Sequence, residues 1–231
     1  MSMSLRKELI DNYTRNSIFG EESIYKDFVY SYDVEQDYLI LNKYLGSDSK
    51  LYIDDCFDAI GSNFVNSDEL EEVVLSKSIK EIYASAFVTS GLEKINLENV
   101  KYIGENAFAH TNLKGGIDLS FCELLERDSF AFTNIDEIKF GKFIHISKRA
   151  FSYIYTLKEL IFNDVYLETE ALTESYVKNV KVSGYILMED KACLYAIYLE
   201  SFDAVNLEHL QKDCFLGCKR LKYINFPGLL V

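Results

Sequence analysis

Short runs of alternating apolar and polar residues recur along most of the chain. Alternation with a period of two, combined with β-branched residues, indicates short strands with one buried face and one solvated face. The third and fifth residues of each run are then expected to point away from the core. The runs share the form L-x-x-I-x-L and lie at residues 70–75, 92–97, 135–140, 157–162, 177–182, 202–207 and 221–226, with one added glycine in residues 113–119.

A second column of residues keeps step with these runs. In most copies a small residue directly precedes a large apolar anchor, and an aliphatic residue stands five positions before that anchor. A fixed period of about 20 residues is typical of a solenoid, in which stacked repeats bury one continuous core. We therefore predict an aromatic spine along the inside of the coil. Its anchors are Phe64, Phe87, Phe108, Phe130, Phe151, Leu172 and Phe215, which are 21 to 23 residues apart except for a last gap of 43.

These two columns resemble the BspA-type leucine-rich repeats. The closest matches are LEKINLENVKYIGENAFAHT at residues 92–111 and KDCFLGCKRLKYINFP at residues 212–227, and the resemblance covers about residues 38–231. It implies an α/β-type repeat solenoid, a right-handed coil with a parallel sheet on one face, mostly β with short helical or 3-10 turns. It also implies an association with adhesion and protein binding, and not with one shared reaction.

The resemblance also implies an insertion. Residues 183–198 are similar to the β-hairpin that this family places between coils, with a turn near residues 189–191, and such an insertion would explain the anchor gap of 43. Residues 38–54 are similar to the hairpin-like first unit of such arrays. We therefore assign residues 38–231 to one solenoid domain with a β-hairpin insertion near residues 183–198.

Residues 1–37 lie outside the resemblance. Residues 4–15 place apolar side chains at helical spacing, and Ser4 is of the type that caps a helix N-terminus. We interpret residues 1–37 as an N-terminal helical cap or extension, and a cap would shield the first coil. The alternative is a partner-binding or dimerising helix. The apolar residues of this predicted helix are Leu5, Leu9, Ile10 and Tyr13.

The net charge of −13 is concentrated toward the N-terminus. Residues 1–72 hold 16 acidic and 6 basic residues, whereas residues 73–231 hold 21 acidic and 18 basic residues. Affinity for a nucleic-acid backbone comes from lysine and arginine, so direct nucleic-acid binding is disfavoured. An acidic end could steer a basic protein partner, or occupy a nucleic-acid-binding protein in place of phosphates. It could also serve only solubility and discourage pairing of an exposed strand.

The chain shows no signal for export or for a membrane. Its N-terminus lacks the apolar core of a secretory signal, and no run approaches the roughly 18 apolar residues that a membrane span needs. The five cysteines are scattered and odd in number, which suits free thiols in a reducing compartment. We therefore predict a cytoplasmic protein without a membrane span. The sequence does not fix its oligomeric state.

No arrangement of residues points to catalysis. Cys214 and Cys218 are close enough in sequence to suggest a metal site, but zinc needs about four ligands, and both occupy small-residue columns of the repeat. His110, His145 and His209 lie one repeat or more apart, and no nucleophile, phosphate-loop or zinc-protease motif is present. We therefore predict no catalytic residue, no cofactor and no metal, and expect that the protein is not an enzyme.

The candidate binding residues are outward positions of the predicted strands. In residues 202–207 these positions are Ala204 and Asn206. Stacked strands would turn such positions into a ladder of mixed charge, which either only pairs charges across strands or recognises a partner. We predict partner binding by Glu71, Glu72, Val74, Lys94, Asp118, Glu137, Lys139, Glu159, Ile161, Lys181 and Tyr223.

The leading interpretation is a protein-binding module that holds one macromolecular partner on an extended repeat surface. The expected partner is a protein, either a basic one or one that binds nucleic acid. Two alternatives stay open. The first is an acidic inhibitor that mimics phosphate charge toward a nuclease or another nucleic-acid-binding protein. The second is a surface adhesin, which requires export.

Overall fold

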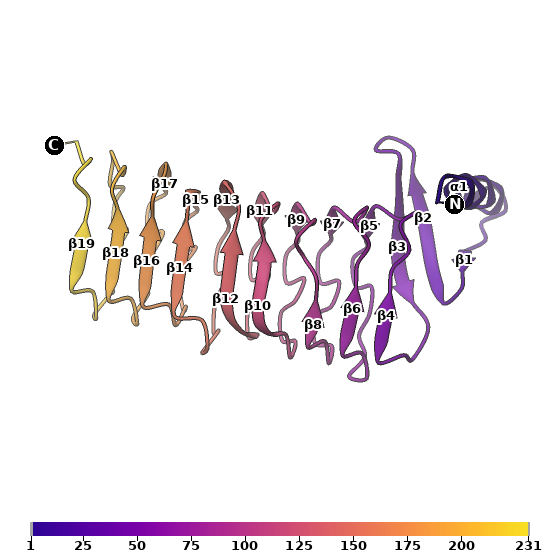
Figure 1. Ribbon diagram of the computed structural model, residues 1–231, viewed down its shortest axis with the longest axis horizontal. Coiled ribbons are helices and arrows are strands. Elements are labelled where there is room, and N and C mark those ends of the chain that lie inside the picture. Colours follow the sequence, from indigo (N-terminus) through magenta and orange to yellow (C-terminus); the bar gives the residue numbers. More distant parts are fainter. Residues whose placement is uncertain (1, 231) are drawn as a thin grey trace.

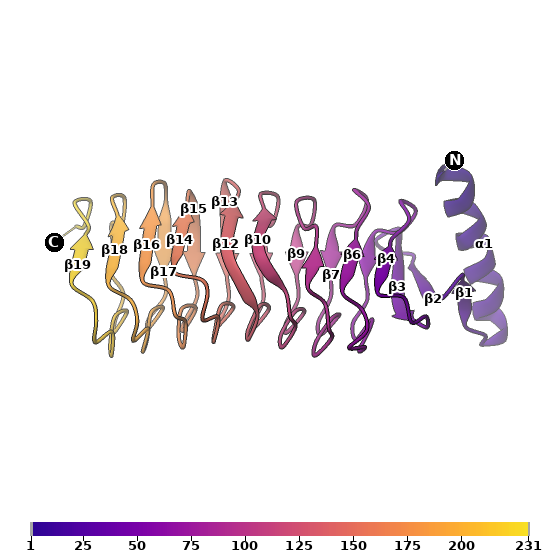
Figure 2. The ribbon, with the colours of Figure 1, turned by 60° about the horizontal axis from the view of Figure 1, so that its bottom comes forward.

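The computed structural model describes residues 2–230 and shows an elongated solenoid with one helix at its N-terminal end (Figures 1 and 2). Successive strands advance along the long axis, so residues that are close in sequence stay close in space. The helix, α1 (Ser2–Phe19), lies beyond the first strands. The predicted repeat solenoid is confirmed.

One row of strands forms a continuous ten-stranded sheet. It begins with β1 (Ser23–Tyr25), β2 (Phe28–Asp33) and β3 (Tyr38–Tyr44), which pair antiparallel, and every later pairing in the row is parallel. Most later strands in this row are two to four residues long, because each coil turns away after a brief extended segment. They are β5 (Ala59–Ile60), β7 (Glu81–Ile82), β9 (Tyr102–Ile103), β11 (Leu124–Leu125), β13 (Phe143–Ile146), β15 (Asp164–Leu167) and β17 (Ile186–Met188).

The second row contains the L-x-x-I-x-L copies and forms three separate parallel sheets, β4-β6-β8, β10-β12 and β14-β16-β18-β19. Their inward residues are buried, except for Ile224 in the last strand, and their outward residues are wholly or partly exposed, as the alternation predicts. We call the outward side of this row the strand face. Its strands are β4 (Lys50–Tyr52), β6 (Glu72–Val74), β8 (Lys94–Ile95), β10 (Lys114–Leu119), β12 (Asn134–Phe140), β14 (Glu159–Phe162), β16 (Asn179–Val182), β18 (Ser201–Ala204) and β19 (Tyr223–Asn225).

The anchor side chains form the predicted spine between the two rows. The Phe87 and Phe108 rings stack with centroids 5.4 Å apart, and the Phe108 and Phe130 rings stack at 5.1 Å. All the predicted anchors are buried except Phe215, which is partly buried. Burying one phenylalanine stabilises a fold by about 1.5–3 kcal/mol, so the spine is a main source of stability.

From Phe87 onward, each anchor sits in a compact turn between two left-handed residues. Around Phe87, the Ala86 amide donates to the Tyr83 carbonyl and the Ser90 amide donates to the Phe87 carbonyl. The third residue of each of these turns has a positive φ, as in a type II turn. The same pattern flanks each later anchor, with φ between 52° and 62° except at Gly217. The left-handed residues are Ser85, Thr89, Asn106, His110, Asp128, Phe132, Arg149, Tyr153, Glu170, Glu174, Lys191, Tyr195, Asp213 and Gly217.

Residues 183–198 do not form the expected β-hairpin insertion. Strand β17 pairs in parallel with β15, as in every other coil. Cys193 takes the anchor position: its amide donates to the Cys214 carbonyl (2.9 Å), and its side chain is fully buried. The gap of 43 residues is therefore two ordinary repeats. The prediction failed because cysteine can replace phenylalanine as a small buried apolar side chain.

The boundary expected between residues 37 and 38 is also wrong. It falls in the turn that joins β2 to β3, and both strands belong to the ten-stranded sheet. Only residues 2–19 of the expected helical cap are helical, because the sequence from residue 23 alternates as strands do. The N-terminal unit is thus a helix followed by antiparallel strands that continue directly into the solenoid.

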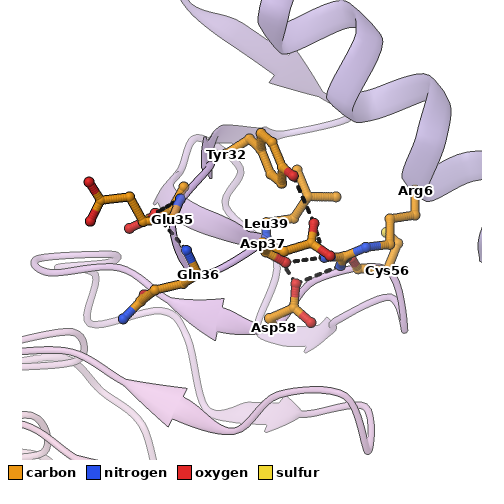
Figure 3. Close-up of polar contacts among 9 residues, drawn as sticks. Arg6, Tyr32, Glu35, Gln36, Asp37, Leu39, Cys56 and Asp58 are labelled. Carbon is orange, nitrogen blue, oxygen red and sulfur yellow. Dashed lines mark hydrogen bonds and ion pairs between the residues drawn. The ribbon is translucent and has the colours of Figure 1, made fainter.

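Polar contacts fasten α1 to the first coil (Figure 3). Arg6 Nη1 donates to the Cys56 carbonyl (3.0 Å) and to Asp58 Oδ2 (2.5 Å), while Nη2 bonds the Asp37 carbonyl. Asp58 Oδ2 also accepts from the Leu39 amide at 2.9 Å. One arginine therefore ties the helix to the β2–β3 turn and to the segment before β5.

Candidate binding surfaces

The strand face collects ten of the eleven predicted binding residues. Pairing of β6 with β8 aligns Glu72 with Lys94, and pairing of β10 with β12 aligns Asp118 with Lys139. Glu71 is the exception: it precedes β6, and its carbonyl accepts from the Glu93 and Lys94 amides. The residues of the two outward columns are Glu72, Lys94, Glu137, Glu159 and Tyr223 in one and Val74, Asp118, Lys139, Ile161 and Lys181 in the other.

The outward pair expected at Ala204 and Asn206 is wrong. Strand β18 begins at Ser201, and Ala204 is buried. Ser201 aligns with Asn179 and Asp203 with Lys181, so Ser201 and Asp203 are the outward residues. The motif was read three residues late, since Phe202 aligns with Val180 and is the fourth residue of its run, not the first.

Charges on the strand face pair across strands. Lys139 Nζ lies 2.7 Å from Asp118 Oδ2, and Lys50 Nζ lies 3.0 Å from Glu72 Oε2. Burial alone would raise the pKa of Asp118, but hydrogen bonds from Lys139 and Ser120 outweigh burial and hold that pKa below its ordinary value. Exposed pairs of this kind contribute about 0.2–1 kcal/mol each, so they stabilise the face only modestly.

Apolar side chains interrupt this charged face. Ile161 is 53% exposed and Tyr223 is 52% exposed. Between β12 and β14 lies a hollow of about 300 Å³, lined by Asp136, Glu137, Ile138, Glu159 and Ile161. A hollow with an apolar wall and a carboxylate rim offers an anchoring point of the kind that protein interfaces use.

The turns carry a second surface that the strand pattern did not reveal. Aromatic side chains two residues after successive anchors stack on one another. The ring centroids of His110 and Phe132 lie 4.2 Å apart, and those of Phe132 and Tyr153 lie 4.5 Å apart. Alternation says nothing about turn positions, although the period of about 21 residues was visible in these aromatics. We call this surface the turn face, and its first stack is His110, Phe132 and Tyr153, with Tyr195 further along the same column.

A neighbouring stack runs beside the first on the turn face. The Tyr155 and Tyr176 rings lie 4.3 Å apart, and the Tyr176 and Tyr198 rings lie 4.2 Å apart. The Arg220 guanidinium lies over Tyr198, 4.9 Å from the ring centroid. Interaction with the Tyr198 phenol raises the pKa of Tyr176, and burial and Tyr155 raise it further. The turn face is therefore aromatic, hydroxylated and already in contact with a cation.

A hollow of about 400 Å³ opens between the two stacks. Glu174 occupies the column position between Tyr153 and Tyr195, and its Oε2 lies 3.3 Å from Arg149 Nε. The same Nε lies 3.1 Å from Asp128 Oδ1, so one arginine serves two carboxylates. Hydrogen bonding to Glu174 raises the pKa of the Tyr153 phenol. The lining residues are Tyr153, Thr173, Glu174, Tyr176, Tyr195, Ile197 and Tyr198.

The cysteines and His145 lie apart from these two surfaces. Burial raises the pKa of the Cys122 thiol to about 12 and that of the Cys193 thiol well above its ordinary value, which disfavours thiolate chemistry. His145 Nε2 contacts Glu168 Oε1 at 2.7 Å on the outer side of β13. Within residues 2–230, no group of three or more His, Cys, Asp or Glu side chains is placed to hold a metal ion.

The helix content bears on the membrane question. Among the described residues, α1 is the one helix, and it does not combine the length and the apolar content that are needed to cross a bilayer.

Comparison with solved structures found similar chains, two of which are described here. The pneumococcal vaccine antigen PcpA aligns with 91% of this chain and 71% of its own chain, at 15% identity and a TM-score of 0.54. A leucine rich cell surface protein from Faecalibacterium prausnitzii A2-165 aligns with 89% of this chain and 94% of its own, at 15% identity and a TM-score of 0.38. At this identity the likeness to PcpA concerns the fold alone.

Sequence comparison identifies the family. No functionally curated protein matches the chain. The model of the BspA type leucine rich repeat region matches residues 47–158 and residues 123–230, in six copies. Together these segments cover most of the chain and include the strands from β4 onward and all the anchors described above. The protein belongs to the BspA-type leucine-rich-repeat family.

Proposed function

We propose that the chain is a protein-binding module that holds a macromolecular partner across its strand face. The observation that carries the proposal is the alignment of ten outward residues on one surface. Seven of them carry charges of both signs, and two of them, Ile161 and Tyr223, are exposed apolar or aromatic side chains. Repeat surfaces of this kind provide a wide contact area, and exposed apolar residues beside a hollow supply anchors. Membership of a repeat family associated with protein binding supports the same function.

A matched pair of variants tests this proposal. Ile161→Asp places a charge on the strand face, whereas Leu187→Asp places the same charge on an outward position of β17, in the other sheet. A partner is first identified by cross-linking in a native lysate and then purified. We expect Ile161→Asp to weaken its binding at least about tenfold, which is about 1.4 kcal/mol, and Leu187→Asp to leave binding unchanged. Equal affinity of both variants would exclude the strand face.

The acidic N-terminal third is the observation on which the inhibitor alternative rests. Several of its carboxylates already have intramolecular partners: Asp58 pairs with Arg6, Asp54 with Lys26 and Glu72 with Lys50. Those carboxylates are less available to a basic protein than the sequence suggested, which favours the general binding function. Competition with DNA or RNA for a basic partner, together with binding that weakens steeply with salt, would support the inhibitor instead.

The location of the protein stays a prediction. A cytoplasmic location suits the free cysteines, four of which are buried, whereas the adhesin alternative requires export. The solved relative from Faecalibacterium prausnitzii is described as a cell surface protein. Fractionation of native cells separates these cases: protein found only in the cytosol removes the adhesin alternative, and protein on the cell surface removes the cytoplasmic prediction.

A further inference from the structure

The first aromatic stack of the turn face is interrupted at one position that lacks an aromatic ring. His110, Phe132 and Tyr153 follow one another two residues after successive anchors, and Tyr195 holds the same position two coils after Tyr153. Between them the position is held by Glu174, which has no ring. The hollow of about 400 Å³ lies at this place and includes Tyr153, Glu174 and Tyr195 in its wall.

The width of the gap suits one flat group. Neighbouring coils are separated by about 4.8 Å, so residues two coils apart are separated by roughly 9.5 Å. A planar group between two rings needs about 3.5 Å on each side, or roughly 7 Å in all. Tyr195 leaves additional room, because it leans over Gly217, where a Cβ atom would lie 2.2 Å from Tyr195 Cδ1.

The charge of the gap favours a cation. Asp128 and Glu174 both contact the single Arg149 guanidinium, so the three groups carry one net negative charge. The Glu174 Oε2 atom is buried and makes no hydrogen bond of good geometry among the described residues, since its contact with Arg149 is an ion pair only. Aromatic faces also attract cations, arginine above all.

The neighbouring stack provides an internal precedent. After Tyr155, Tyr176 and Tyr198, the next coil supplies Arg220, whose guanidinium lies over the Tyr198 ring. A guanidinium therefore already takes the place of a ring in this architecture. Lys158 also lies near the Tyr176 ring, with Nζ 5.7 Å from the centroid.

We propose that this gap is a binding slot for an arginine side chain of a protein partner. The guanidinium lies between Tyr153 and Tyr195 and donates hydrogen bonds to the Glu174 carboxylate. The slot lies in the turns and not on the strand face, so it goes beyond the function proposed above and holds whether or not the strand face binds. A planar, charged fork fits such a slot better than the compact ammonium of lysine.

Titration of the full chain with short peptides, followed by NMR, tests the slot. The probe is acetyl-Gly-Arg-Gly-amide, and the matched peptides carry citrulline, which is flat but uncharged, or lysine. We expect shifts confined to residues around Glu174, with a dissociation constant of roughly 1–10 mM for one such contact. Citrulline and lysine should bind roughly tenfold more weakly or not at all. Glucose serves as a further uncharged control. The proposal is overturned if citrulline binds as tightly as arginine, if glucose shifts the same residues, or if the arginine peptide causes no local shift.

Two variants separate the slot from general effects. Glu174→Tyr restores the missing ring in a column where Tyr153 and Tyr195 already adopt the same left-handed backbone, and it should abolish arginine binding without unfolding the chain. Glu174→Gln keeps the shape and removes the charge, so arginine and citrulline should then bind alike. Tyr185→Ala removes a tyrosine beside β17 that is about as exposed as Tyr195, and it should leave arginine binding unchanged. Arginine binding that survives Glu174→Tyr overturns the proposal.

Discussion

The anchor side chains decide how closely successive coils stack. Phe108 is fully buried and lies between two other rings, almost parallel to Phe87, with an interplanar angle of 3°, and at 13° to Phe130. A ring in this position contacts both neighbouring coils, so its loss would affect three repeats at once. The small residue before each anchor, such as Ala107, is buried as well and leaves room for this close approach.

Replacing this central ring should therefore be costly. Phe108→Ala is expected to lower the free energy of unfolding by about 3–5 kcal/mol, because it removes buried contacts and leaves a cavity. Phe121→Ala is the matched control, since Phe121 is 63% exposed and should change stability by no more than about 0.5 kcal/mol. Urea unfolding followed by circular dichroism measures both. Similar losses for the two variants would contradict the proposed role of the spine.

One carboxylate links stability to pH. The Tyr166 phenol, the Thr169 amide (2.8 Å) and the Thr169 hydroxyl (2.9 Å) all donate to Glu189, and the hydrogen bond from Tyr166 contributes most to lowering its pKa. The same hydrogen bond raises the pKa of Tyr166 to about 12. A lowered pKa in the folded state stabilises the fold above the unfolded pKa, and this stabilisation is lost as pH falls through the folded value.

Glu189→Gln should therefore be less stable than the parent chain at neutral pH, and the difference should shrink as pH falls below about 4. Urea unfolding over a series of pH values measures this difference. Glu208→Gln, at an exposed position, should show no such convergence. A difference between Glu189→Gln and the parent that stays constant down to acid pH would mean that the charge of Glu189 plays no part.

At the scale of elements, the alternation of apolar and polar residues and the repeat period predict where strands and coils lie. Strands β6, β14, β16 and β19 lie within their L-x-x-I-x-L runs because apolar residues alternate toward a shared core. The coil around Cys193 was missed because its anchor lacks a ring, although burial there needs only a small apolar group. The register of β18 was missed because an apolar residue such as Phe202 can be either the fourth residue of a run from 199 to 204, as it is here, or the first residue of a run begun three residues later.

The same reasoning explains how much of the candidate sites was predictable. The outward residues of the strand face follow directly from strand periodicity, so Glu72, Lys139 and Ile161 were placed correctly. The slot at Glu174 depends on a turn column, where no periodic polarity marks which side chains are exposed. The sequence signal for the slot is a missing aromatic residue, because a carboxylate stands where neighbouring repeats have rings.

The helix α1 depends on few contacts with the solenoid. Leu9 is the buried residue of the helix, and the Leu9 carbonyl accepts a hydrogen bond from the Tyr30 hydroxyl at 3.0 Å. Arg6 supplies the charged contacts. Hydrogen bonds to charged groups contribute about 1.5–3 kcal/mol when partly buried. The attachment of α1 is therefore expected to be the least stable part of the N-terminal unit.

Arg6→Met tests this attachment, because methionine keeps an unbranched side chain and removes the donors. We expect faster hydrogen exchange across residues 2–19, equivalent to about 1–3 kcal/mol of opening free energy, and unchanged exchange in the coils from β5 onward. Arg15→Met removes an exposed arginine of the same helix and should leave exchange unchanged. Slower folding or faster exchange throughout the chain would instead make Arg6 part of the solenoid core.

At the scale of the whole molecule, charge is unevenly distributed along a rod. Residues 1–72 carry a net charge of −10, and residues 2–72, from α1 to the start of β6, lie at one end (Figure 1). The remaining coils are nearly balanced and hold cross-coil ion pairs such as Lys139–Asp118 and Lys148–Glu170, both 2.7 Å. Each coil interacts mainly with its neighbours, so the two ends can respond differently to the same change in solvent.

Added salt should therefore act differently at the two ends. At about 0.01 M salt the screening length is roughly 30 Å, and at 0.15 M it is about 8 Å. Screening relieves repulsion among the excess carboxylates of the first third, but it weakens the ion pairs of the later coils. Hydrogen exchange at the two salt concentrations should show protection rising for β2 to β6 and staying constant or falling for β12 to β18, by on the order of 0.5 kcal/mol. Glu21→Gln combined with Glu22→Gln, at two exposed positions, should reduce the gain at the first end only. Because both ends experience the same solvent, a uniform response along the rod would show that local charge balance does not govern its stability.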